Sequence, residues 1–226
     1  MEFTLLWAAL TGLGGLWLGS RLVEEVAFDD LLSASIAGLA GGRVVEMLSQ
    51  GLNPLTNPMD LLIVRGGVDT TAATVVALLT LYLVSGRAIS RLDAAAPVAM
   101  FGLAGWHLGC LWRGACLGTA SNLPWAWSEP GSVISRHPVE IYAALGFLAA
   151  AWLVSRLPGH PGARAGAGLA LAAAIRLATE PIRLSIGGGP VPEYMIGLGI
   201  GIAVGVIAFS RGRPGHTAAP LPRSGP

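Results

Sequence analysis

The strongest candidate for a chemical site is a group of three charged residues in the segment RLATEPIR, at positions 176–183. Spacings of four and seven residues place Arg176, Glu180 and Arg183 on one face of a predicted helix. Two arginines around one carboxylate predict a net positive surface at the membrane boundary. A planar guanidinium can donate two parallel hydrogen bonds to a phosphate, so this group favours binding of a lipid phosphodiester. Pro181 is expected to kink this helix because it removes a backbone donor. A structural ion pair between helices explains the same residues equally well.

A second pair of charged residues, Arg43 and Glu46, has the spacing of neighbours on one helix face. Gly41 and Gly42 precede the pair, and glycine lets another backbone or a lipid headgroup approach closely. Both a structural ion pair and a contact with substrate fit this pattern.

The segment AGWHLGCLWRGACLG, at positions 104–118, concentrates sulfur and imidazole groups. His107 and Cys110 are helical neighbours, as a Cys-His nucleophile requires, although buried and inert cysteines are commoner. A zinc site needs about four nitrogen or sulfur ligands, and only these residues, Cys116 and the distant His137 are on offer, so no metal is expected. Two cysteines are also too few for a disulfide framework.

Two further groups of polar residues have the positions of helix starts. In the segment RHPVEIY, His137 takes the N-cap position, Pro138 the first helical position and Glu140 the first turn. A histidine at this boundary could also exchange protons near neutral pH. Asp69 and Thr70, which follow a Gly-Gly turn, are expected to cap another helix.

The elements that must position these groups are strongly apolar. Of 226 residues, 53% are apolar and 12% charged, about half the charge of an ordinary soluble domain, and the mean hydropathy is +0.64. The composition therefore predicts an all-α integral membrane protein, in which spans of roughly 20 residues cross the bilayer. The expected spans are 3–22, 31–48, 68–85, 94–112, 138–154, 163–184 and 192–210. They form one seven-span domain, 1–210, followed by a disordered Pro/Gly-rich tail, 211–226.

The arginines indicate how this bundle is oriented. Eight arginines fall on one side of the predicted bundle and four on the other. The positive-inside rule therefore predicts an N-terminus outside and a cytoplasmic C-terminus. The external segment 113–136 carries Trp125 and Trp127, which are typical of anchors at a membrane interface.

Several function classes are disfavoured by composition. The chain has no lysine, which excludes Schiff-base chemistry and a P-loop. A net charge of +1 gives no basic field for nucleic acid. Intramembrane charge would suit a small transporter, but no internal repeat supports that class.

Taken in order, five motifs resemble those of the prolipoprotein diacylglyceryl transferase family, which are seven-span bacterial inner-membrane enzymes. The resemblance runs from about residue 29 to 206 and includes a Gly-x-Arg stretch, a Gly-Gly turn, a glycine-rich signature, a His-Pro-x-Gln-x-Tyr-Glu motif and an Arg-x-x-x-Glu-x-x-Arg motif. In this sequence they read GGRVVEML (41–48), RGGVDTTAA (65–73), GWHLGCLWRGACLG (105–118), RHPVEIYAA (136–144) and RLATEPIR (176–183).

The resemblance implies a function. Members of this family move a diacylglyceryl group from phosphatidylglycerol to the lipobox cysteine thiol of a prolipoprotein and release glycerol phosphate. The implied partners are thus phosphatidylglycerol and a prolipoprotein signal peptide, without a cofactor. The candidate catalytic residues are His107, His137 and Glu180. The candidate substrate-binding residues are Arg43, Gly109, Arg113, Gly118, Arg176 and Arg183.

The sequence also departs from the family pattern at several positions. The histidine after the Gly-Gly turn, the family's proposed proton acceptor, is replaced by Thr71, and the arginine before the signature glycine by His107. The glutamine and glutamate of the His-Pro motif become Glu140 and Ala143. Two functions therefore remain open. One is a divergent transferase in which His107 or His137 is the base. The other is a catalytically lapsed member that binds phospholipid or serves as a subunit of a membrane complex.

Overall fold

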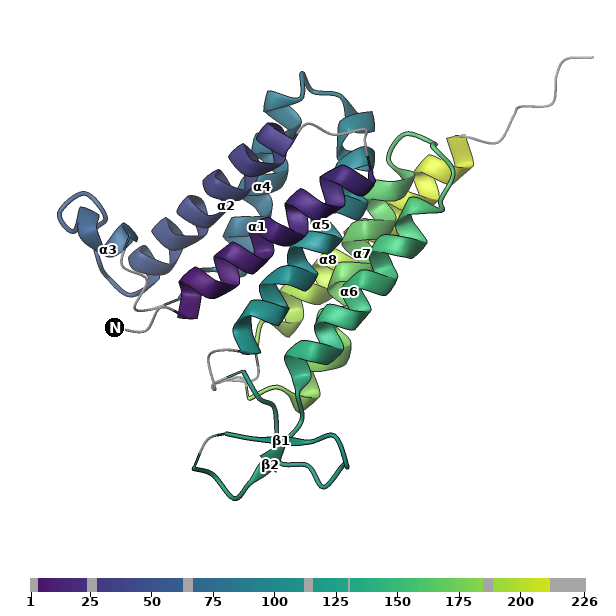
Figure 1. Ribbon diagram of the computed structural model, residues 1–226. Helices are drawn as coiled ribbons and strands as arrows, with labels where there is room; N and C mark the ends of the chain where they lie inside the picture. The colour runs from purple at the N-terminus through teal and green to yellow at the C-terminus, as the bar shows by residue number, and fades with distance from the viewer. Residues whose placement is uncertain are drawn as a thin grey trace, which may run out of the picture.

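The computed structural model describes residues 4–23, 28–62, 67–111, 116–129, 131–184 and 189–211, and this part of the chain is mostly helical (Figure 1). The long helices are α1 (Thr4–Leu22), α2 (Phe28–Ser49), α4 (Thr70–Val84), α5 (Ile89–Cys110), α6 (Val139–Ser155), α7 (Ala163–Thr179) and α8 (Val191–Arg211). Short helical turns form α3 (Pro58–Leu62) and η2 (Glu180–Ile182). Each predicted span coincides with one long helix. The tail beyond Arg211 lies outside the described residues.

Three of these helical segments are long and apolar enough to cross a membrane by length and composition: α2, α7 with its η2 extension, and α8. Two more, α4 and α6, are apolar but shorter. Large apolar side chains also stay exposed on the outer faces of the helices, for example Trp152 at 58% and Ile196 at 62%. An apolar exterior of this kind suits contact with lipid rather than with water.

Helix α5 is the central element, because it packs against α1, α6 and α7 (Figure 1). Its contact with α1 depends on small residues: a β-carbon on Gly105 would overlap the carbonyl oxygen of Thr11. On the other side of the molecule α2 packs against α4, where a β-carbon on Gly42 would lie 2.6 Å from the carbonyl oxygen of Asp69. Close backbone approach is how helices associate in lipid. The glycine-rich helix sequences are thus explained by packing.

Two helix starts test the capping predictions. Asp69 is the N-cap of α4 and accepts a hydrogen bond from the backbone N–H of Ala72 at 2.7 Å, as predicted. Helix α6 instead begins at Val139 with Pro138 at its N-cap and without a side-chain cap, so the placement of His137 there was wrong by one residue. Glu140 does occupy the first turn, but its carboxylate is used elsewhere.

The start of α7 is capped by a buried carboxylate from another helix. Asp93 of α5 is 6% exposed and accepts hydrogen bonds from the backbone N–H groups of Gly162 and Ala165, at 2.6 and 2.8 Å. An acceptor there satisfies two donors that have no partner within the helix. The contact joins α5 to α7, the helix that carries Arg176.

We expect Asp93→Ala to lower the free energy of unfolding by about 2–3 kcal/mol, because two buried N–H groups would lose a charged acceptor. Thermal unfolding of the purified protein in detergent would measure the loss. Asp29→Ala, which removes an exposed carboxylate near the start of α2, is the matched control and should shift the midpoint much less. Equal midpoints for the two variants would contradict the capping role.

The connection between α5 and α6 forms a small hairpin beyond one end of the helices (Figure 1). Strand β1 (Trp127–Ser128) pairs antiparallel with β2 (Ser135–Arg136), and Ala120 makes an isolated bridge to Arg136. The indole of Trp125 donates to the hydroxyl of Tyr142 on α6 at 2.8 Å. This bond ties the hairpin to the first turns of α6.

Candidate active site

The predicted group Arg176, Glu180 and Arg183 does come together, but not on one continuous helix. Helix α7 ends at Thr179, the tight turn η2 follows, and Arg183 has extended backbone with φ −85° and ψ 145°. The predicted kink at Pro181 is therefore a helix end, because proline cannot continue the hydrogen-bond ladder. Glu180 Oε2 still lies 3.9 Å from Arg183 Nε and 4.0 Å from an Arg176 guanidinium nitrogen.

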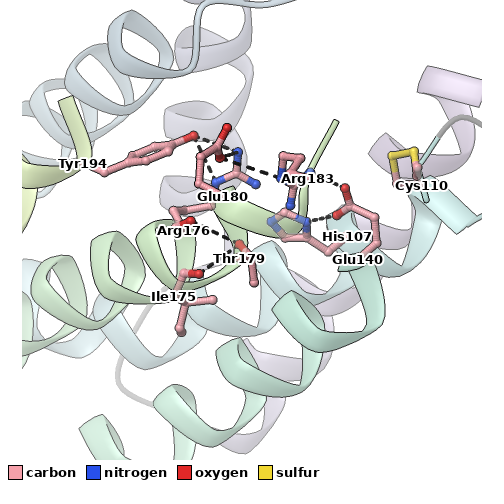
Figure 2. Close-up of polar contacts among 10 residues, drawn as sticks. His107, Cys110, Glu140, Ile175, Arg176, Thr179, Glu180, Arg183 and Tyr194 are labelled. Atoms are coloured by element: carbon pink, nitrogen blue, oxygen red, sulfur yellow. Dashed lines mark hydrogen bonds and ion pairs between the residues drawn. A yellow bond between two sulfur atoms is a disulfide. The ribbon is translucent and has the colours of Figure 1, made fainter. Parts of the chain in front are cut away.

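A second carboxylate, Glu140, completes this cluster (Figure 2). One oxygen of Glu140 pairs with Nδ1 of His107 on α5, and the other accepts a hydrogen bond from the guanidinium of Arg183. Glu140 is 3% exposed and His107 6%. The imidazole also stacks on Phe147 of α6, with ring centroids 5.2 Å apart. Three elements distant in sequence therefore meet at one buried carboxylate.

The charge of the cluster differs from the prediction. Two arginines around one carboxylate predicted a net positive surface, but the structure adds the carboxylate of Glu140 to that group. Two guanidiniums and two carboxylates sum to zero with His107 neutral, and to one positive charge with His107 protonated. Binding of an anion at this site therefore depends more on hydrogen bonds from the guanidiniums and on protonation of the imidazole than on an excess of positive charge.

Arg183 retains donors that can serve an anion. Its Nε and one terminal nitrogen are buried and have no hydrogen-bond partner in the part of the chain that the structure describes. Buried donors without an acceptor are costly, so their presence indicates a site for a ligand or water.

The guanidinium of Arg176 is held by Tyr194 of α8. It donates to the tyrosine hydroxyl through Nε at 3.0 Å and through a terminal nitrogen at 2.7 Å. The same guanidinium lies 5.1 Å from the centroid of that ring. Tyr194 was not predicted from the sequence, in which a tyrosine at a helix start resembles any interfacial aromatic residue.

The glycine signature positions Arg183 through its backbone. The N–H of Thr119 donates to the carbonyl of Ile182 at 2.8 Å, and the N–H of Gly118 donates to the carbonyl of His137 at 2.7 Å. A β-carbon on Gly118 would overlap the carbonyl oxygen of Ile182. Only glycine therefore permits this approach, one residue before Arg183.

A cavity of about 190 Å³ opens beside Glu140 and Arg183. Its other lining residues are Leu117, Val139, Leu184 and the two cysteines. Cys110 and Cys116 form a disulfide, which corrects the expectation of two inert cysteines. Helix α5 ends at Cys110, so the chain turns and brings Cys116 back to it instead of carrying it further along a helix.

The other predicted site residues lie elsewhere. Arg43 is buried and donates to the backbone carbonyls of Asp60 and Gly67, both at 3.0 Å. No ion pair joins it to Glu46 within the described residues, and that glutamate accepts a hydrogen bond from Gln50. Arg43 thus fixes the loop around α3.

Gly109 contacts α1, where a β-carbon would lie 2.5 Å from the α-carbon of Ala8. The ring of His137 packs edge-on against Tyr142, and its buried Nδ1 has no partner among the residues described. Thr71 is exposed in the first turn of α4. Arg113 falls outside the described residues.

Comparison with known proteins agrees with the family resemblance that these motifs carry. The model of the prolipoprotein diacylglyceryl transferase family matches residues 4–212. The chain belongs to this family. A phosphatidylglycerol–prolipoprotein diacylglyceryl transferase of Solidesulfovibrio magneticus is 30% identical over 170 residues, which cover 69% of this chain and 64% of that protein. One from Chlamydia trachomatis is 27% identical over 157 residues, which cover 64% of this chain and 58% of the relative.

Membership of the prolipoprotein diacylglyceryl transferase family agrees with the apolar helices of the chain and makes it a membrane protein. The match spans less than two thirds of the length of these curated relatives. Within the family pattern, Glu140 stands where a glutamine is usual and His107 where an arginine is usual, and in this chain the two residues contact each other. The two departures therefore belong to a single interaction.

Proposed function

We propose that this chain transfers a diacylglyceryl group from phosphatidylglycerol to a cysteine thiol of a prolipoprotein at the bacterial inner membrane. One observation carries this proposal: a buried imidazole, two carboxylates and two guanidiniums meet beside a cavity. The family match and its curated relatives support the choice of substrates.

In the proposed reaction Arg176 and Arg183 bind the phosphodiester. The acceptor thiol gives its proton to His107. The thiolate then attacks the carbon of the diacylglyceryl group that is bonded to the phosphate oxygen. A C–S bond forms while the C–O bond breaks, and glycerol phosphate leaves with one more negative charge than the diester had. The unused donors of Arg183 would stabilise that charge.

His107 is the preferred base because Glu140 orients its ring. Nδ1 contacts the carboxylate, which leaves Nε2 as the nitrogen that exchanges a proton. A base oriented by a carboxylate is a recurring arrangement in nucleophilic catalysis. The proposed role of Glu180 is electrostatic, since it lies between the two guanidiniums.

The proposed topology has seven spans, with the N-terminus outside and the C-terminal tail in the cytoplasm. It is supported by the arginine distribution and by the disulfide, because disulfides persist in oxidising compartments. The end of α5, the start of α6 and the end of α7 gather at one end of the helices, where the hairpin lies (Figure 1). This end would face the exterior.

The transfer assay uses the purified protein in vesicles that contain labelled phosphatidylglycerol, together with a lipobox peptide. We expect a thioether-linked product, and absence of any product would refute the transferase. We also expect Arg176→Ala to lower kcat/KM by about 10- to 100-fold, since charge-assisted hydrogen bonds contribute about 1.5–3 kcal/mol. Arg156→Ala, an exposed position at the end of α6, is the control and should retain activity.

A second candidate is a lapsed family member that binds phospholipid or serves as a subunit of a membrane complex. It is favoured by Thr71, which cannot act as the family's histidine does, and by the neutral sum of the Arg/Glu cluster. Copurification of a stoichiometric anionic phospholipid without turnover would support it. Complementation of a strain that lacks its own transferase would exclude it.

A further inference from the structure

The disulfide lies beside the charged cluster and lines the same cavity as Glu140 and Arg183. Both sulfur atoms lie within 4.8 Å of a carboxylate oxygen of Glu140. Cys110 is half-buried, and the cavity gives access to the disulfide from one side. A sulfur–sulfur bond is thus placed next to a carboxylate and a guanidinium in an accessible space.

Two ordinary explanations for this cysteine pair are weak. The bond closes a loop of six positions in sequence and does not join distant elements, so its contribution to the fold is local. Cys110, Cys116 and Glu140 are also spaced like metal ligands, but a metal requires thiolates and these sulfurs are bonded to each other. The donor set does not fit a metal in this state.

The groups around the bond are those that thiol–disulfide exchange needs. Each oxygen of Glu140 accepts one hydrogen bond, and a carboxylate has about four lone-pair sites, so it can still accept a proton from an incoming thiol. Arg183 has buried donors without a hydrogen-bond partner within the described ranges. A guanidinium beside a sulfur stabilises the thiolate form.

The geometry points to the Cys110–Cys116 disulfide as a thiol-exchange site, whose substrate is the thiol of a cysteine-containing peptide. The peptide thiol gives its proton to Glu140 and attacks one sulfur. A new S–S bond forms to the peptide, the bond between the two cysteines breaks, and the other cysteine leaves as a thiolate beside Arg183. This reaction goes beyond the proposed function, because it needs a thiol and no phospholipid.

The test uses the full-length protein in detergent without phosphatidylglycerol. A biotinylated peptide with one cysteine is added, the reaction is stopped with acid, and intact mass and peptide mapping detect the mixed disulfide. We expect the peptide on Cys110 or Cys116, at a rate at least tenfold above that of the same protein unfolded in SDS. A native rate equal to or below the unfolded rate would overturn the exchange site.

Variants locate the groups involved. Glu140→Gln should slow exchange at least tenfold, whereas Glu193→Gln, an exposed carboxylate in the first turn of α8, should not. Equal rates for these two variants would contradict the role of Glu140.

Cys110→Ser and Cys116→Ser should form no mixed disulfide with the reduced peptide. Circular dichroism checks folding, and if Glu140→Gln is unfolded, the native-versus-SDS comparison of the unmodified chain decides. Exchange without lipid transfer would reject the transferase and retain this site.

Discussion

Replacement of Glu140 by alanine is expected to reduce diacylglyceryl transfer by about 10²- to 10⁴-fold, the range usually associated with acid–base groups. The substitution leaves His107 without its orienting carboxylate and Arg183 without its closest anion. Removing one partner of a buried ion pair typically costs about 3–5 kcal/mol of stability. The variant should therefore lose both activity and thermal stability, which the vesicle assay and unfolding in detergent measure separately.

Glu193→Ala is the matched control, because it removes an exposed carboxylate from the first turn of α8. It should retain both transfer and the unfolding midpoint. For Glu140→Ala, an added phospholipid that restores the unfolding midpoint separates the loss of stability from the loss of transfer. If the variant stabilised in this way recovers full transfer, Glu140 has only a structural role and His107 does not need it as an orienting group.

The second large effect concerns His107 and Glu140, the two residues that differ from the family pattern and contact each other. The double variant His107→Arg/Glu140→Gln would restore the family's residues at both positions. We expect Glu140→Gln alone to be less stable than the double variant, with a coupling of about 0.5–3 kcal/mol between the two positions, since the two side chains are in contact. Transfer by the double variant should nevertheless fall about 100-fold, because its proposed base is gone.

Introducing the family's missing histidine tests whether the base has moved. Thr71→His should change transfer little in both the double variant and the unmodified chain, because position 71 is exposed in the first turn of α4 and lies outside the cluster around Glu140. Rates from initial product formation give this comparison directly. A double variant as active as the unmodified chain would show that His107 is not the base, and the proposed role of His107 would have to be withdrawn.

The helices could be predicted from the sequence, because each is an apolar segment of about the length that a helix needs to cross a bilayer. Seven predicted spans coincide with the seven long helices of the described residues, and Asp69 caps α4 as its position after a Gly-Gly turn indicates. Local rules suffice there, since a cap and its partner lie within four residues.

Contacts between distant segments could not be predicted in this way. Glu140 was interpreted as a first-turn residue favoured by the helix dipole, yet its partners lie 33 and 43 positions away. Arg43 was paired with its helical neighbour Glu46, whereas carbonyls of a loop that returns to it take its donors. For both residues, contacts with distant segments determine the partners of the side chain, and helical spacing does not.

The unpredicted disulfide has a related cause. Spacing of six residues within an apolar stretch reads as a continuing helix, and Cys116 would then point away from Cys110. The helix ends at Cys110, and the following segment instead pairs its backbone with His137 and Ile182. The end of α5 at Cys110 therefore allows the two cysteines to form a disulfide.

The contact between His107 and Glu140 also bears on the order in which an ancestor could have lost the family's pattern. Starting from arginine at position 107 and glutamine at position 140, a first change to glutamate gives an intermediate with a new ion pair. A first change to histidine leaves Arg183 beside the neutral amide that the starting pattern already had, and it gives the imidazole no carboxylate to orient it. A route with glutamate first therefore provides an acceptor for the guanidinium of Arg183 at every later step, and two single changes suffice to reach the present pair.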